Sequence, residues 1–493
     1  MKKYIFAILS TAFIGFSACS KDTLDEINKD DHNPTPDVVP ASLQLADAIL
    51  STGYSTSSGD YAFYLASLNE QEMGVGNNQL SKAEERNSLE WASSSTFNNV
   101  WNSTYSNLKN IREIIRKIET EVPGNVGQYD LLGMAQVLEV LNWGMLTDMH
   151  GDIPYSESMQ GKNNLQPKLD AQKDVYAGMM STLEAGIANL EKGKDLKSVQ
   201  KHDLVFGGDP KKWLATAYAV KARYLLHQLA VNPSLITDVK SAAQKAIELG
   251  FDGCNITLFD KDAQNPWYAF YQSRKYTASS NTVVKLMEAN DDPRLDAYTN
   301  GKGFGSEPGD MEAAKIQDGS LPAPAWLVSG SNSVPLPTIH ILSKSELYFI
   351  LAEAQLRTNE DATEAYQIAV EASVKEILTW MSVDISMAAT FAASLGTPTL
   401  KTLFEQKYLA QCVDEQVETY NDFRRLEAMG ESYITLTNPH NKQSGINRYP
   451  YRLPYGNSTV TSNPNVANAY GDGFYIYGKK TWINEGNQFV VIQ

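Results

Sequence analysis

Aromatic rings beside polar side chains are the residues of this sequence whose types and spacing best suit binding chemistry. A saccharide presents C–H faces that stack on Trp and Tyr rings, while Asn, Arg and carboxylate groups bind its hydroxyls. Three such clusters occur in segments without a helical stripe. The predicted ligand-binding residues are Asn77, Asn78, Arg86 and Trp91, then Trp267, Tyr268, Tyr271, Arg274 and Tyr276, and finally Trp326. Large rings in loops also pack onto scaffolds, and that alternative stays open for each of them.

A second group of candidates is titratable. Asp148, His150 and Asp152 lie within five residues of each other, a spacing that could serve a metal ion or acid–base chemistry. However, Gly151 in a C-cap position, Asp152 bonded to the following turn and Pro154 together predict the end of a helix. Three ligands this close on a turn rarely converge on one metal ion unless distant residues add others. We therefore interpret this motif as structural.

The remaining charged motifs also have structural interpretations. Arg424 and Arg425 could bind an anion, but pairing with a helix terminus or with a carboxylate such as Asp422 is the favoured interpretation. Glu346 and Glu353 share one helical face, and acid–base catalysis would require a cleft around them. Nucleophile elbow, P-loop and zinc protease motifs are absent from the sequence. The sequence therefore predicts no catalytic residue, no metal site and no cofactor.

Helical hairpins are the elements predicted to position these residues. Apolar residues recur at spacings of three and four over residues 97–118, which predicts an amphipathic helix. Further helices are predicted over residues 129–146, 171–190, 211–229, 239–249, 343–356 and 362–380. Short turns between alanine-rich helices are typical of tetratricopeptide-type hairpins, although strict 34-residue periodicity is absent. The predicted fold is mainly α, with degenerate hairpins of this type as scaffold and little β structure.

Long loops rich in aromatic residues are expected between the hairpins. Residues 251–280 and 299–340 hold many Gly, Pro, Asn and Ser residues together with Trp and Tyr. The carboxy-terminal stretch from Gly445 also lacks a periodic pattern. Loops of such length are usually functional or disordered, and the aromatic residues argue against disorder.

Charge and cysteine content exclude several classes of protein. The 493 residues include 42 Lys and Arg against 58 Asp and Glu, which gives a formal net charge of -16. An acidic chain repels polyphosphate, so ordinary nucleic-acid binding is excluded. The three cysteines, at positions 19, 254 and 412, are too few for a disulfide framework.

The amino terminus has the pattern of an export signal. Lys2 and Lys3 precede an apolar stretch over residues 4–16, and small residues lead directly to Cys19. This resembles the lipobox of bacterial lipoproteins, in which the cysteine is lipidated; an ordinary signal peptide with a chance cysteine is the alternative. The predicted organisation is a signal peptide over residues 1–18, a lipidated tether over 19–42 and a single ligand-binding body over 43–493.

Four motifs in order resemble one family. They are residues 146–157 (LTDMHGDIPYSE), 204–213 (LVFGGDPKKW), 345–354 (SELYFILAEA), and 406–410 with 420–425 (QKYLA and YNDFRR). Together they resemble the SusD/RagB nutrient-binding outer-membrane lipoproteins of Bacteroidetes. The tail departs from the family pattern, because Gly456 and Asn457 follow Tyr455 and only Trp482 remains of the final tryptophan motif.

The resemblance implies a lipid-anchored, surface-exposed protein of the outer membrane that is not an enzyme. It implies capture of a glycan or oligosaccharide and its delivery to a SusC-like TonB-dependent transporter, with ligand contacts from Arg86 and Trp91. A helical scaffold that binds peptide or protein, and a glycoside hydrolase, are the alternatives.

Overall fold

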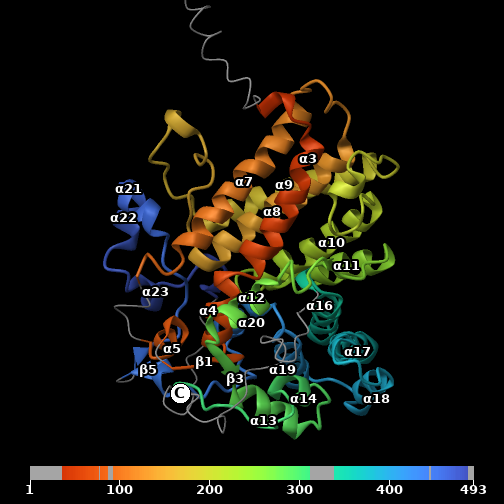
Figure 1. Cartoon of the computed structure of the whole chain (residues 1–493), viewed down its shortest axis with the longest axis vertical. Coiled ribbons are helices and arrows are strands. Elements are labelled where there is room, and N and C mark those ends of the chain that lie inside the picture. The colour runs from red at the N-terminus through yellow and green to blue at the C-terminus, as the bar shows by residue number, and fades with distance from the viewer. Residues whose placement is uncertain (1–35, 77, 87–92, 311–337, 444–445, 487–493) are drawn as a thin grey trace, which may run out of the picture.

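The computed structural model describes residues 36–76, 78–86, 93–310, 338–443 and 446–486, and this part of the chain is mainly helical (Figure 1). The helices are α3 (Ala41–Ser51), α4 (Asp60–Leu68), α5 (Gln79–Glu84), α7 (Asn98–Glu119), α8 (Tyr129–His150), α9 (Gln172–Lys192), α10 (Pro210–His227), α11 (Ile236–Glu248), α12 (Pro266–Arg274), α13 (Asn281–Ala289), α14 (Leu295–Thr299), α16 (Lys344–Arg357), α17 (Thr363–Trp380), α18 (Ser386–Ser394), α19 (Leu400–Ala410), α20 (Gln416–Ala428), α21 (Asn457–Ser462), α22 (Pro464–Tyr470) and α23 (Tyr475–Gly478).

Successive long helices pack side by side as hairpins, with α7 on α8, α8 on α9, α10 on α11 and α16 on α17 (Figure 1). The helix α8 is at the centre of this array, since every residue from 130 to 150 is buried. A helix that is apolar nearly all round needs neighbours on every side, and α7, α9, α10 and α3 supply them. The predicted mainly helical fold built of hairpins is confirmed.

Strands are short and come in antiparallel pairs. The described pairs are β1 (Glu72–Gly74) with β3 (Thr277–Ser279), β2 (Cys254–Ile256) with β4 (Ile339–Leu342), and β5 (Lys442–Gln443) with β6 (Ile446–Asn447). The first pair joins the segment before α5 to the segment after α12. The expected scarcity of β structure is confirmed.

Two segments expected to be irregular contain helices. Residues 251–280 include α12, where the Asn265 side chain accepts the backbone N–H of Trp267 at 2.9 Å and Pro266 occupies the first turn. An Asn cap followed by Pro is a favourable start, so a nine-residue helix forms without an amphipathic pattern. The stretch after Gly445 likewise contains α21, α22 and α23. The prediction that these segments are loops is wrong for their helical parts.

Part of the predicted tether lies against the helical body. The Lys117 side chain of α7 donates to the carbonyl oxygen of Val39 at 2.9 Å, and Ala41 is buried at the start of α3. The predicted lipidation site, Cys19, lies outside the described residues. No helix in the described ranges is long and apolar enough to cross a membrane.

Candidate functional site

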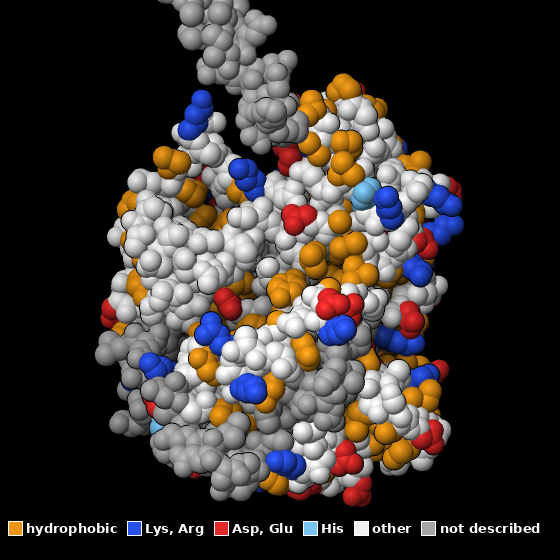
Figure 2. Space-filling model, in the orientation of Figure 1, with side chains coloured by type: hydrophobic (Ala, Val, Ile, Leu, Met, Phe, Trp, Pro, Cys, Tyr) orange, Lys and Arg blue, Asp and Glu red, His pale blue; other side chains and the backbone are white. Residues whose placement is uncertain are grey.

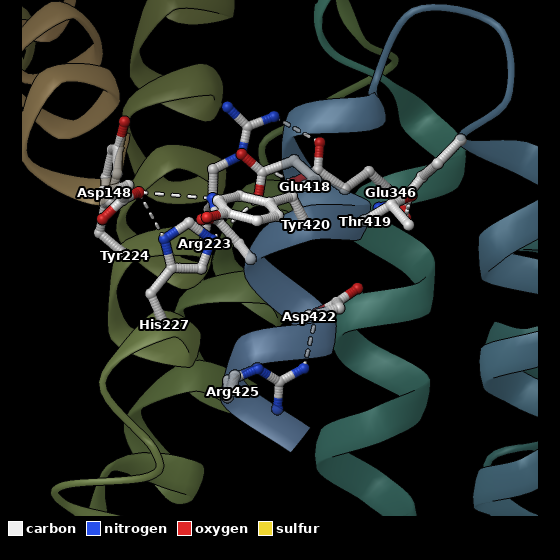
Figure 3. A network of polar contacts seen from close by, with 12 residues as sticks. Asp148, Arg223, Tyr224, His227, Glu346, Glu418, Thr419, Tyr420, Asp422 and Arg425 are labelled. Atoms are coloured by element: carbon white, nitrogen blue, oxygen red, sulfur yellow. Dashed lines mark hydrogen bonds and ion pairs between the residues drawn. The ribbon is translucent and has the colours of Figure 1, made fainter. Parts of the chain in front are cut away.

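The family-like helix motifs form a buried network of ion pairs where α8, α10, α16 and α20 meet (Figure 3). In α10, Arg223 donates through Nε to Oε1 of Glu346 at 2.7 Å. His227, one turn further along α10, lies between Oδ2 of Asp148 at 3.0 Å and Oε2 of Glu418 at 2.8 Å. These contacts join helices that are far apart in sequence.

The positive and negative side chains of this network compensate each other's charge. Burial alone would lower the pKa of His227, but the carboxylates of Glu418 and Asp148 raise it to about 9. Burial alone would raise the pKa of Glu418, but Arg223 and His227 lower it to about 2. All of these residues are 8% or less exposed. The carboxylates are therefore engaged by protein groups, which argues against an acid–base role.

The two arginines of the last motif have structural partners. Arg425 donates to Oε1 of Glu353 at 2.6 Å and to Oδ1 of Asp422 at 2.7 Å. Arg424 donates to the carbonyl oxygen of Asp148, near the carboxyl end of α8, at 2.8 Å. The predicted pairing with a carboxylate and with a helix terminus is confirmed.

The motif around Asp148 and His150 also has a structural role. Gly151 follows α8 with a φ of +81°, and a Cβ atom there would lie 2.7 Å from the Arg452 guanidinium. His150 is buried 2.7 Å from the Tyr61 hydroxyl, and its burial lowers the pKa to about 3. Asp152 accepts the backbone N–H of Gln172 at 3.0 Å. The interpretation as a helix end is confirmed, although Asp152 bonds to the start of α9 and not to the following turn.

A cavity of about 550 Å³ lies beside α16 and α17 and contains further titratable groups. His340 lies there between Oδ1 of Asp414 at 2.7 Å and Oε1 of Glu376 at 3.0 Å. The Glu415 carboxylate accepts the backbone N–H of Ser343 at 2.9 Å and its hydroxyl at 2.8 Å. The imidazole and Glu415 are thus held by internal bonds, as in the network described above.

Asn78 and Arg86, two of the predicted ligand contacts, lie at the two ends of α5. The Asn78 side chain caps the helix by accepting the backbone N–H of Leu80 at 2.8 Å. Arg86 is 1% exposed and donates to the carbonyl oxygen of Ala83 at 2.7 Å and to Oδ1 of Asn441 at 2.8 Å. Both side chains therefore fix the backbone around α5 in this structure.

Two buried carboxylates complete the region around α5. Glu70 accepts the backbone N–H of Asn438 at 2.7 Å. Glu84 accepts the backbone N–H of Gly309 at 3.4 Å, and burial raises the pKa of its carboxyl to about 8 although its hydrogen bonds oppose the shift. We call this set the α5 junction; it joins the segments around residues 70, 84–86 and 438–441 and is bonded to a further segment at Gly309. Its members are Glu70, Glu84, Arg86, Asn438 and Asn441.

The α5 junction is where the chain leaves the described body toward two of the predicted tryptophans. Arg86 is the last described residue before 87–92, and Asp310, next to the bonded Gly309, is the last before 311–337. Trp91 and Trp326 lie in those two segments. They and Asn77 lie outside the described residues.

The second predicted cluster divides between core and surface. Trp267 is fully buried with its ring edge-on to Phe63, their centroids 4.7 Å apart. Tyr268 and Tyr271 are 9% and 8% exposed on the same helix, so the expectation that these rings lie in a loop free of core packing is wrong.

Arg274 is exposed and Tyr276 is half-buried. The Tyr276 carbonyl accepts the backbone N–H of Val75 at 2.7 Å, which extends the β1–β3 pairing. Because Val75 precedes α5 by only a few residues, this pairing brings the outer part of the second cluster close to the first.

Comparison with known families settles the classification. Residues 39–456 match a SusD-like family model that is described as starch-binding and associating with the outer membrane. The chain belongs to the SusD-like family. A search of curated proteins found no match.

Solved SusD-like structures share this fold over most of their length. A SusD/RagB family protein from Bacteroides thetaiotaomicron is 32% identical, with a TM-score of 0.76, and the match covers 91% of this chain and 100% of that one. A chitin-binding SusD homolog from Flavobacterium johnsoniae is 19% identical, with a TM-score of 0.68 and coverage of 90% and 98%. A SusD homolog from Bacteroides uniformis is 18% identical, with a TM-score of 0.66 and coverage of 90% and 99%.

Sequence reasoning missed most of the α5 junction of this SusD-like protein. The sequence contains 58 Asp and Glu residues, and no motif distinguishes Glu70 and Glu84 from the others. Their partners Asn438 and Asn441 lie more than 350 residues further along the chain than either carboxylate. No local pattern could have connected them, since the contact depends on the whole fold.

Proposed function

We propose that this SusD-like protein binds a glycan or oligosaccharide at the cell surface and delivers it to a partner TonB-dependent transporter of the SusC type. In this proposal a lipid on Cys19 anchors the protein to the outer membrane. The family description, starch-binding and associating with the outer membrane, supports glycan binding and a location at the outer membrane. One solved structure with this fold is described as chitin-binding, which supports a glycan as the class of ligand.

The observation that carries the ligand site is the convergence at the α5 junction. The segments with Trp91 and Trp326 leave the body there, and β1–β3 pairing brings Tyr276 and Arg274 close. Among the described residues, the half-buried Tyr276 ring and the exposed Arg274 side chain lie near this junction, and a ring beside a polar group is what stacking on a sugar and binding its hydroxyls require. We therefore place the glycan next to the α5 junction.

Binding is proposed to occur without cleavage. Glycoside hydrolysis needs two carboxyl groups that flank a bond in an accessible cleft. In the described part of the chain, the family-like motif acids Glu346 and Glu353 are buried and paired with arginines. A saccharide bound at the surface would meet neither of them.

Replacement of Trp91 by alanine is expected to weaken glycan binding about tenfold while the melting temperature stays unchanged, because a stacking ring contributes on the order of 1 kcal/mol. A calorimetric and array screen of the soluble body from Asp22 onward measures this. Trp267→Ala is the matched comparison: the buried ring leaves a cavity, so this variant should lose about 3–5 kcal/mol of stability. Unchanged binding by the Trp91 variant would remove that ring from the site.

Affinity purification from native membranes in mild detergent is expected to recover a large β-barrel protein in near-equal amount. A binding protein without a channel has to dock on a transporter, and the helical hairpins offer a large rigid surface for this. Recovery of the lipoprotein alone would contradict the proposed partnership and leave the glycan site untouched.

A further inference from the structure

A groove lies at the amino-terminal end of α4, whereas the α5 junction lies at its carboxy-terminal end. The groove encloses about 480 Å³ between α4, α7, α12 and the helical turn over Thr52–Ser57. Its lining includes three aromatic rings and a set of small polar side chains. The rings are Tyr54, Phe63 and Phe270, and the polar residues are Ser55, Asp60, Ser103, Gln264 and Ser273.

The rings form a firm platform. Phe63 and Phe270 stack with centroids 4.3 Å apart, and the buried Trp267 supports Phe63 from the core side. Tyr54 is 36% exposed, so part of its ring is available to a ligand. Figure 2 shows that hydrophobic side chains also follow α3, the helix that leads into this turn, on the same face of the molecule.

Asp60 is the polar group that gives the groove its chemistry. Its side chain lies in the first turn of α4, is partly buried, and has no hydrogen-bond or ion-pair partner among the described residues. Burial raises the pKa of this carboxyl. A desolvated carboxylate beside rings gains most from a donor that a ligand supplies, because its own surroundings provide none.

The lining also restricts the ligand. None of the described residues that line the groove is Lys or Arg. Asp60 is the one charged side chain among them, and it would repel an anionic ligand. A purely apolar ligand would leave the carboxylate without a partner. A neutral sugar ring offers a C–H face for Tyr54 or Phe270 and hydroxyl donors for Asp60, and it fits a volume of this size.

We propose that this groove is a second saccharide subsite, which takes a neutral sugar unit of a glycan whose other units lie at the α5 junction. The inference rests on the proposed function. The groove and the α5 junction lie at opposite ends of α4, whose nine residues rise by about 13 Å, a distance that a few sugar units can bridge. Longer oligosaccharides then bind more tightly than short ones, because only they reach both places.

Calorimetric titration with two series of neutral oligosaccharides tests this, from maltose to maltoheptaose and from chitobiose to chitohexaose. Tyr54→Ala and Asp60→Asn are each expected to weaken binding of the longest oligosaccharide about tenfold and to leave binding of the disaccharide within twofold of wild type. Phe474→Ala is the matched control, since this ring is 37% exposed and does not line the groove. It should bind like wild type.

The outcomes separate this inference from the proposed function. If wild type binds a long oligosaccharide and both groove variants bind it equally well, the subsite is overturned and glycan binding stands. If the variants weaken the disaccharide and the longest oligosaccharide equally, the groove is not a separate subsite. If wild type binds no member of either series, both the subsite and the proposed glycan class are overturned. Melting temperatures of the variants within a few degrees of wild type exclude unfolding as the cause.

Discussion

Arg223→Ala is expected to lower the free energy of unfolding by about 3–5 kcal/mol, as removal of one partner from a buried ion pair does. Arg223 is 5% exposed and donates to Glu346 and to the carbonyl oxygen of Ile341 at 2.9 Å. Its loss leaves the Glu346 carboxylate, 2% exposed, as an unpaired charge between α10 and α16. Urea denaturation of the soluble body measures the change.

Two companion variants give this result its meaning. Arg223→Met combined with Glu346→Leu removes both charges and should recover most of the lost stability, because an apolar pair of similar volume replaces them. Lys285→Ala breaks an exposed pair with Glu307, 3.0 Å apart, and should cost less than about 1 kcal/mol. An Arg223→Ala protein as stable as wild type would show that the network does not hold these helices together.

The long helices could be predicted because their patterns are local. The stripe through Val100, Leu108 and Ile111 is buried as a unit along α7, and the structure begins and ends the hairpin helices within a few residues of the expected positions. Such a helix owes most of its stability to the packing of its apolar face, and the spacing of that face is visible in the sequence. The boundaries follow from side-chain periodicity and turn residues that any reader of the sequence can see.

The burial of α12 could not be predicted in this way. Trp267 packs on Phe63, a residue about 200 positions earlier in the chain. The sequence around Trp267 contains no pattern that predicts this contact. A short helix with rings on several faces has no periodic signature, so its aromatic residues look alike in sequence whether they face solvent or core. The structure separates them: Trp267 supports the core, whereas Phe270, which was not singled out, lines a groove.

The same reasoning explains the charged motifs. Glu346, Asp422 and Arg425 lie in motifs that resemble those of the family. Charged residues of this kind are equally suited to catalysis and to pairing with other side chains of the protein. The choice depends on whether the partners are other side chains or open space, which only the fold decides. Here the partners are arginines, lysine and carboxylates of neighbouring helices. The charged residues of these motifs thus hold the helices of the scaffold together.

Cys19→Ala is expected to release the protein almost completely from the outer membrane into the soluble fraction while its melting temperature stays unchanged. Acyl chains contribute about 0.8 kcal/mol for each buried CH₂ group, so a lipidated cysteine with several chains supplies nearly all of the attachment. With residues 1–18 removed, the loss of Lys2 and Lys3 takes the formal net charge from -16 to -18, and an anionic membrane surface repels a chain of that charge.

Cys412→Ala is the matched control for this experiment, because Cys412 is buried in the body and cannot carry an anchor without unfolding. Fractionation of cells that express each variant should therefore find Cys412→Ala with the outer membrane and Cys19→Ala in the soluble fraction. Retention of Cys19→Ala with the membrane in the absence of the transporter would refute lipid anchoring at this cysteine. Retention only in its presence would instead mean that docking on the transporter alone suffices to hold an unanchored protein at the membrane, since the folded body that docks is the same in both cases.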